Sequence, residues 1–301
     1  MNLCWGLRVT FDREQAKKVL IKPFKEKGRT FIEENGDLQY PRLFFNKLSK
    51  SETQERLTLL TYFYVLFDTQ KQSRYHYRDM LKLYVADNNF LTLENILKRN
   101  HEQAKKFVTN NLGTMAKKGV YLIDGYTRIK TEYDSNIMNL VDKDVAITQK
   151  RIEAMPGFGD QVAGLFLHTL RDNKIFKFEN EEDLCPKVDF HDYNLGVSTG
   201  IIKDLHGETP QTRKTLYSQF LRDLAKEENI NIFDLDSYMW AIGQICVQKN
   251  ISLCEYQCPL SSLYEGPRTF YLKNDYSEKA TTKKNKKIAD ELQVKLGFKF
   301  D

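Results

Sequence analysis

Apolar side chains recur at helical spacing through most of this chain. The clearest stripe joins four leucine and aromatic positions between 57 and 67, which fall on one face of a helix. Three further amphipathic segments follow, at 79–85, 91–97 and 101–115, with breaks near Asn88-Asn89 and near Gly113. Helical patterning continues in pieces from 137 to 224. The hydrophobic pattern therefore predicts a mainly α fold.

The first 40 or so residues follow a different pattern. They mix strand-like and turn-like pieces at 7–11, 17–23 and 28–38, the last with a turn signal at Asn35-Gly36-Asp37. We therefore expect a small sheet or an irregular lead-in there, before a helix that starts with Ser51 as its cap. The predicted parts of the chain are a lead-in over 1–50, a helical domain over 51–265 and a basic extension over 266–301.

Composition narrows the class of protein. Hydrophobic residues make up 41% of the 301 positions and charged residues 29%, which excludes a wholly disordered chain. The 15 glycines and 7 prolines are few for a turn-rich all-β protein. No apolar run reaches the length of a membrane span, and five cysteines suit a reducing compartment. We expect a cytoplasmic protein, and the net charge of +5 permits a nucleic-acid partner without requiring one.

The most informative segment is a hairpin near 145–171. An apolar stretch ends at Met155, a Pro-Gly-Phe-Gly turn occupies 156–159, and a second helix is predicted to start near Asp160. Pro156 disfavours helix at the residue before it, and the two glycines let another backbone approach closely. The first amides of the second helix would lack carbonyl partners and carry the positive end of its dipole, a geometry that binds phosphate.

This segment resembles the helix-hairpin-helix motif of the DNA glycosylase superfamily, L-P-G-V/I-G-x-K/Q-x-A. Met155 stands at the first position, and the match continues at Pro156, Gly157, Gly159 and Ala163. A helix–turn–helix packing corner is the alternative interpretation. The residues for which the resemblance implies DNA contact are Gly157, Phe158, Gly159, Asp160 and, from the segment described next, His191.

A second resemblance lies in residues 185–196. The glycosylase pattern P-x-V/L-D-x-H is matched in order, with its carboxylate at Asp189. The arginine that often follows is replaced by Asn194. The resemblance implies that Asp189 is catalytic, because a carboxylate stabilises the positive charge that develops on deoxyribose and orients water. An ordinary helix cap is the alternative role, and Asp192 is the runner-up carboxylate.

Gln161 occupies the hairpin position where bifunctional members carry a lysine. That lysine attacks the sugar and then cuts the strand, whereas an amide is no nucleophile. The resemblance therefore implies a monofunctional enzyme with weak or no lyase activity, in which Gln161 reads the target base.

Three cysteines resemble a degenerate iron–sulfur loop of endonuclease-III-type glycosylases. Cys246, Cys254 and Cys258 follow the spacing C-x7-C-x3-C, each loop is one residue longer than in the family, and Tyr264 stands at the fourth ligand position. We favour a lost cluster over a bound cluster or zinc completed by a distant ligand such as Cys185, and coincidence is the third interpretation. We therefore expect no cofactor and no metal.

These matches predict the two-lobed helical fold of the superfamily, with a small β element at the N-terminus. The function they imply is a monofunctional DNA glycosylase that flips a damaged or modified base and hydrolyses its N-glycosidic bond. DNA repair and defence against modified foreign DNA are both suitable settings. We expect a monomer that binds double-stranded DNA near the nucleoid and does not bind membranes. The alternatives are a non-catalytic helix-hairpin-helix DNA-binding protein and a nucleoside or ribosyl hydrolase.

Overall fold

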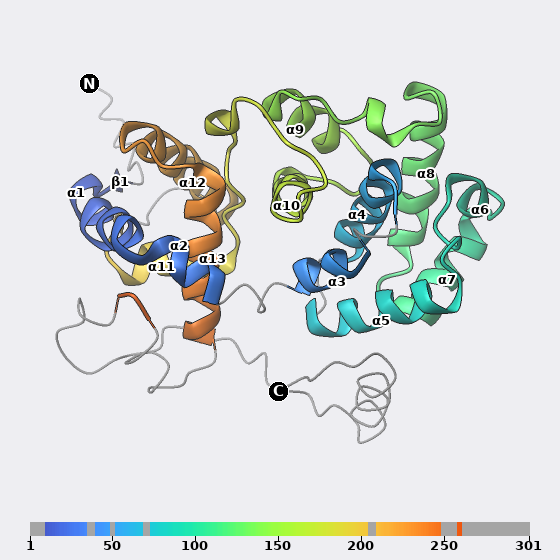
Figure 1. The fold of residues 1–301 in the computed structure, drawn as a ribbon, viewed down its shortest axis with the longest axis horizontal. Helices are drawn as coiled ribbons and strands as arrows, with labels where there is room; N and C mark the ends of the chain where they lie inside the picture. Colours follow the sequence, from blue (N-terminus) through green and yellow to red (C-terminus); the bar gives the residue numbers. More distant parts are fainter. Residues whose placement is uncertain are drawn as a thin grey trace, which may run out of the picture. The chain divides into compact units, whose positions relative to one another are not determined.

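The computed structural model describes residues 10–34, 40–48, 52–68, 73–203, 209–247 and 258–260. All of them belong to the first of two compact units, residues 1–268. The described part is mainly helical, as the hydrophobic pattern predicts (Figure 1). No described helix has the length and apolarity needed to cross a bilayer.

One group of helices is built around α4. This group comprises α3 (Tyr40–Leu48), α4 (Gln54–Asp68), α5 (Ser73–Ala86), α6 (Leu93–Leu97), α7 (His101–Leu112), α8 (Lys117–Glu132), α9 (Val145–Glu153) and α10 (Asp160–Asp172), with a 3₁₀ turn at Ile137–Asn139. Every residue of α4 from Leu57 to Phe67 is buried, because helices contact it on several sides. Figure 1 shows α4 between α10 and α8. A helix that is buried all round is expected to form the core of its group.

A second group is built around α13. Its members are α1 (Arg13–Ala16), α2 (Arg29–Glu34), α11 (Phe190–Ser198), α12 (Pro210–Glu227) and α13 (Ile232–Val247). Phe24 and Phe31 pack edge-on against Tyr238 of α13, at 5.5 and 5.6 Å between ring centroids. Edge-to-face aromatic pairs of this kind add specificity to burial. The N-terminal segment is therefore part of this group's core.

The N-terminal segment differs from the expectation for it. Residues 17–23 were expected to lie in a small sheet or an irregular lead-in, but Lys17–Ile21 forms a π-helical turn and Phe24–Gly28 forms another. The expectation was wrong for these residues because a short buried apolar run such as Val19-Leu20-Ile21 has no periodicity that separates strand from helix. The Asn35-Gly36-Asp37 turn lies outside the described residues.

The small sheet does form, but its partner comes from far along the chain. β1 (Thr10–Phe11) pairs antiparallel with β2 (Ile202–Lys203), and the Asp12 amide continues the pairing to the Ile201 carbonyl at 2.8 Å. This pairing ties the start of the described chain to the segment that follows α11.

The cap of α4 also differs by two residues. The helix begins at Gln54, and the Thr53 hydroxyl accepts the Arg56 N–H at 3.2 Å. Ser51 lies outside the described residues. Thr53 is therefore the capping residue, which sequence alone did not distinguish from the nearby serine.

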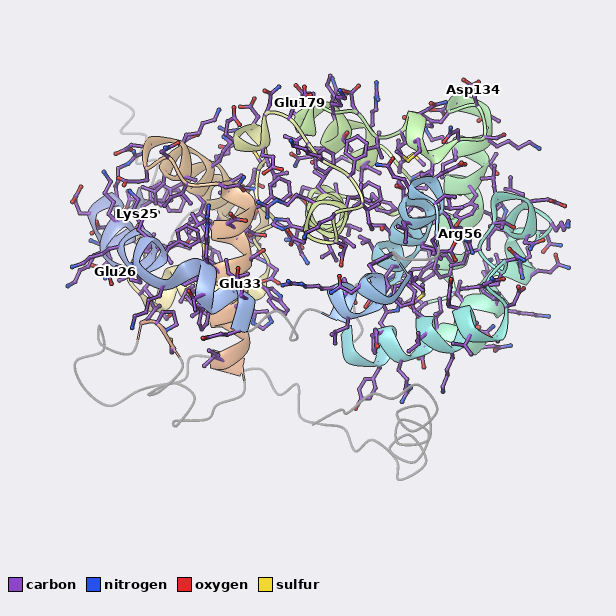
Figure 2. All side chains as sticks on the ribbon, in the orientation of Figure 1. Lys25, Glu26, Glu33, Arg56, Asp134 and Glu179 are labelled. Atoms are coloured by element: carbon purple, nitrogen blue, oxygen red, sulfur yellow. The ribbon has the colours of Figure 1, made fainter. Side chains whose placement is uncertain are left out.

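Charged side chains are concentrated on the outside. Lys25, Asp134 and Glu179 are exposed examples (Figure 2). Glu179 pairs through its backbone with the start of α9, since its N–H bonds to the Lys143 carbonyl at 2.7 Å. The acidic segment before Asp189 is thus anchored to the first hairpin helix.

Candidate functional site

The hairpin forms where the sequence predicts it. Asp144 caps α9 by accepting the amides of Ala146 and Ile147, and α10 begins at Asp160. Gly157 adopts φ +81°, a conformation that favours glycine, and a methyl group there would lie 2.7 Å from the Tyr121 ring. The turn and close packing therefore require Gly157.

Gly159 has a different environment. It is the N-cap of α10, with φ −115°, and a methyl group there would meet no atom within 4 Å. Neither backbone strain nor packing explains this glycine. The space in front of the first turn of α10 is open on this side, as the approach of a ligand backbone would require.

Two neighbouring residues predicted to contact DNA have structural roles. The Phe158 ring is buried and stacks on Tyr62 at 4.7 Å. Only the Phe158 backbone is therefore placed to contact a ligand. Asp160 turns its carboxylate onto the Gln161 N–H at 2.8 Å, and so occupies one of the first-turn amides of α10.

Asp189 caps α11. Its Oδ1 accepts the amides of His191 at 2.6 Å and Asp192 at 3.3 Å, and the Asp192 carboxylate accepts the Asp189 N–H at 3.0 Å. This is a reciprocal capping box. The second oxygen of Asp189, Oδ2, takes part in none of these bonds.

The hairpin and the Asp189 loop are in contact. The Gln161 side-chain amide donates to the Val188 carbonyl at 3.3 Å, next to Asp189. One turn further along α10, a methyl group at Gly164 would lie 3.0 Å from Cβ of Lys187. The structure thus brings Gln161 and Asp189, 28 positions apart in the chain, into one place. The role of Gln161 in reading a base stays a prediction.

The electrostatic surroundings favour a charged Asp189. Burial raises the pKa of this carboxyl, but Lys187, His191 and the two amides outweigh burial, and the pKa lies below its ordinary value. Asp189 is therefore ionised at neutral pH. Burial lowers the pKa of His191, with Lys187 acting in the same direction and Asp189 opposing, so His191 is neutral there.

Lys187 is the residue that sequence reasoning missed. It occupies the variable position of the P-x-V-D pattern, so the motif gave no reason to select it. Its side chain is half-buried, and within the described part of the chain its ammonium forms no hydrogen bond or ion pair. Among its neighbours, Lys187 lowers the pKa of Asp189 the most.

His191 is held by α13. A methyl group at Gly243 would lie 2.5 Å from the His191 Cβ, so α13 approaches α11 as closely as it does because position 243 has no side chain. The C-terminal half of α13 therefore packs directly against His191, two residues after Asp189.

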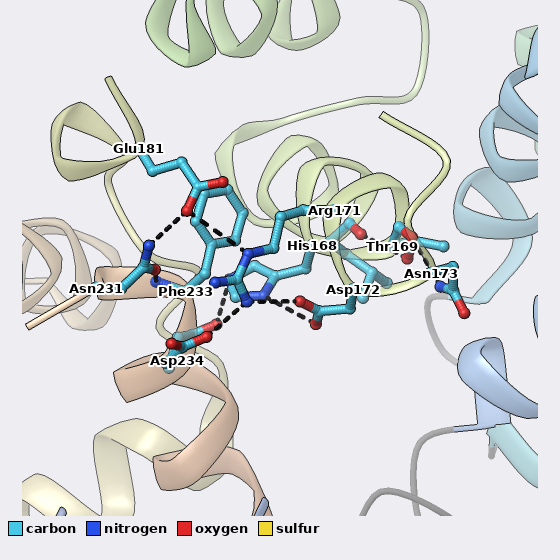
Figure 3. Close-up of polar contacts among 11 residues, drawn as sticks. His168, Thr169, Arg171, Asp172, Asn173, Glu181, Asn231, Phe233 and Asp234 are labelled. Carbon is cyan, nitrogen blue, oxygen red and sulfur yellow. Dashed lines mark hydrogen bonds and ion pairs between the residues drawn. The ribbon is translucent and has the colours of Figure 1, made fainter. Parts of the chain in front are cut away.

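A buried ionic network anchors the other end of α10 to α13. His168 lies 2.8 Å from Asp236 through Nε2 and 3.7 Å from Asp172 through Nδ1. Arg171 reaches Asp234 at 2.6 Å and Asp172 at 3.0 Å, and its guanidinium lies over the Phe233 ring (Figure 3). Burial opposes the charge on His168, but Asp236 and Asp172 outweigh it and raise its pKa to about 9. His168 is therefore charged at neutral pH.

One cavity in the described part of the chain does not include Asp189 or Gln161 in its lining. It has a volume of about 510 Å³ and is lined by Asp87, Phe90, Asn95, Lys98, Arg99 and Gln103. These residues lie in the turn before α6, in α6 itself, in the short segment between α6 and α7, and at the start of α7. None of them is a partner of Asp189.

The cysteine loop falls mostly outside the described residues. Cys258 is buried, whereas the Cys246 side chain, Cys254 and Tyr264 are among the residues not described. Within the described ranges, no three His, Cys, Asp or Glu side chains are grouped so as to hold a metal ion. The loss of the iron–sulfur cluster stays a prediction.

Comparison of the sequence with models of known protein families finds no match, and comparison with curated proteins finds none either.

Proposed function

We propose that this protein is a monofunctional DNA glycosylase with Asp189 as its catalytic carboxylate. The observation that carries the proposal is the contact between Gln161, at the start of the second hairpin helix, and the backbone next to Asp189. A glycosylase needs a phosphate-binding element and an ionised carboxylate close together, because the enzyme must hold the strand where it stabilises the sugar. The predicted two-lobed glycosylase fold belongs to the same proposal.

The chemistry follows from the charge on Asp189. Cleavage of the base–sugar bond leaves positive charge on the deoxyribose, and a carboxylate nearby lowers the energy of that state. Oδ1 is held by two amides, which fixes the orientation of the carboxylate that would stabilise the sugar or orient a water molecule. Gln161 carries no nucleophile, and water therefore completes the reaction.

The hairpin supplies the strand contact. The open space at Gly159 lets a phosphate approach the positive end of the α10 dipole. The partner is double-stranded DNA, bound by a monomer in the nucleoid-containing compartment. The target base belongs to a damaged or modified nucleotide, in repair or in defence against foreign DNA.

A non-catalytic DNA-binding protein is the second candidate, and one observation favours it. The reciprocal capping box gives Asp189 a structural role at the start of α11. In that case the hairpin would bind DNA and Asp189 would only stabilise α11.

One experiment distinguishes the glycosylase from the non-catalytic DNA-binding protein. The protein is incubated with duplexes that carry varied bases, and alkali is then added to cut the strand at abasic sites. The proposal expects free base and alkali-labile abasic sites that disappear in Asp189→Asn. Salt-dependent DNA binding without base release from any duplex, including phage-type modified DNA, would support the second candidate. Base release from free nucleosides, without DNA binding, would favour a nucleoside hydrolase instead.

Borohydride trapping tests the monofunctional assignment. We expect no covalent protein–DNA adduct, because an imine requires an amine at the sugar and position 161 holds an amide. A strong adduct would contradict the role given to Gln161.

Two glycine substitutions separate structure from binding. Gly157→Ala should destabilise the protein by roughly 1–3 kcal/mol, because the residue would be strained at φ +81° and would contact Tyr121. Gly159→Ala should cost no more than about 1 kcal/mol, yet weaken duplex binding because the methyl group fills the open space. Thermal unfolding and salt-dependent binding titrations measure the two effects. Equal duplex binding by Gly159→Ala and the wild type would contradict a phosphate contact there.

A further inference from the structure

Asp192 is a carboxyl group in an unusual place. It is only 2% exposed, and its Oδ2 accepts the Asp189 N–H at 3.0 Å. Its Oδ1 is fully enclosed, and no described residue donates a hydrogen bond to it. An ionised carboxylate with one oxygen buried and unbonded is strongly disfavoured.

The groups facing Asp192 provide no countercharge. Asp189 lies at the start of the same helix, α11. Asp236 faces Asp192 from α13, and the Tyr217 side chain faces Asp192 from α12. Asp236, 9% exposed, also has an enclosed Oδ1 without a donor, and the Tyr217 hydroxyl is enclosed without a partner among the described residues. The cation nearest to Asp236, His168, is already paired with it. No described Lys, Arg or His forms an ion pair with Asp192.

We propose that Asp192 carries a proton at neutral pH and donates its O–H to the Asp189 carboxylate, so that the two side chains share one proton and Asp189 holds the charge. Asp192 is then a positioning residue, because it acts on the sugar only through Asp189. Its catalytic meaning rests on the proposed function, but the protonation itself does not.

The capping geometry decides which of the two is charged. Asp189 receives two amide N–H bonds at the positive end of α11 and lies near Lys187, all of which favour its anion. Burial, Asp189 and Asp236 together hold the pKa of Asp192 well above its ordinary value. A shared proton therefore belongs on Asp192 and not on Asp189.

Asp192→Asn tests the proposal through stability, since the amide imitates a protonated carboxyl. A carboxyl with a raised folded pKa contributes stability that is complete below its unfolded pKa and is lost as the pH rises through the folded value. The variant should therefore become more stable relative to wild type as the pH rises from 5 to 8. The ratio of the wild-type unfolding equilibrium constant to that of the variant should grow by up to tenfold per pH unit. The other groups around Asp192, namely Asp236, His168, His191 and Tyr217, are the same in both proteins, so their contributions cancel to first order. Asp189 has a lowered pKa and is ionised in both proteins over this range.

Asp144→Asn is the matched control. Asp144 also caps a helix, but its pKa is lowered, chiefly by the Asn180 side chain. Its contribution to stability is complete above the unfolded pKa, so the difference between this variant and wild type should be flat from pH 5 to pH 8.

Carbon-13 labelling of the aspartate carboxyl carbons gives a direct readout. One carboxyl signal should titrate far above the others in wild type and be missing in Asp192→Asn. A flat stability difference together with no such signal would overturn the proposal. These measurements do not use DNA, so they can succeed while base release fails, and base release can be found while they fail.

Discussion

Asp189→Asn should lower the rate of base release by at least about 100-fold to 1,000-fold, as expected when one preorganised electrostatic group is removed from a reacting centre. Asparagine keeps the side-chain oxygen that accepts the amides of His191 and Asp192, and asparagine and aspartate cap helices about equally well. The variant therefore removes the negative charge without removing the cap. Single-turnover release of labelled base, at enzyme excess, measures the effect without interference from product release.

The matched control for this substitution is Asp144→Asn. It makes the same chemical change at the N-cap of α9, the first hairpin helix. Base release by this variant should stay close to wild type. An equal loss of activity in both variants, or full activity in Asp189→Asn, would contradict a catalytic Asp189. Duplex binding by Asp189→Asn should persist, because the hairpin is unchanged.

Local sequence signals predicted the hairpin well. Pro156 and Gly157 act on the backbone of their own turn, and α10 begins at Asp160 as expected. The N-cap role of Asp189 was also visible as an alternative, since capping depends on residues within one turn. Features that depend on neighbours in sequence could therefore be read from the chain.

Features that depend on packing between distant segments could not be predicted from the sequence. The partner of β1 is β2, nearly 200 positions later, and nothing in Thr10-Phe11 specifies it. The Lys187 ammonium matters because Gly164 of α10 lets the loop approach, and no motif contains that contact. His168 and Asp236 lie on helices whose pairing is decided by the core around α13. Sequence periodicity gives the buried face of a helix, but not which helix covers it.

His168→Gln should destabilise the protein by roughly 3–5 kcal/mol, the usual result of removing one partner from a buried ion pair. His168 and Asp236 are almost fully buried, and their side chains lie 2.8 Å apart. Asp172 keeps Arg171 as a partner at 3.0 Å, but no other described cation reaches Asp236. Chemical denaturation at pH 6 measures the loss. His101→Gln is the control, because the His101–Asp124 contact is also short, at 2.7 Å, but about half exposed, and should be worth less than about 1 kcal/mol.

The pH dependence distinguishes a charged His168 from a merely well-packed one. Its folded pKa of about 9 lies above its ordinary value of 6.5, so its contribution is complete below pH 6.5 and is lost as the pH rises to 9. Wild type should therefore lose on the order of 3 kcal/mol more stability than His168→Gln between pH 6.5 and pH 9. Parallel stability curves for the two proteins would show that His168 is neutral in the folded state.

Asp236→Asn added to His168→Gln should recover much of the lost stability, because the double variant leaves no unpaired carboxylate between α10 and α13.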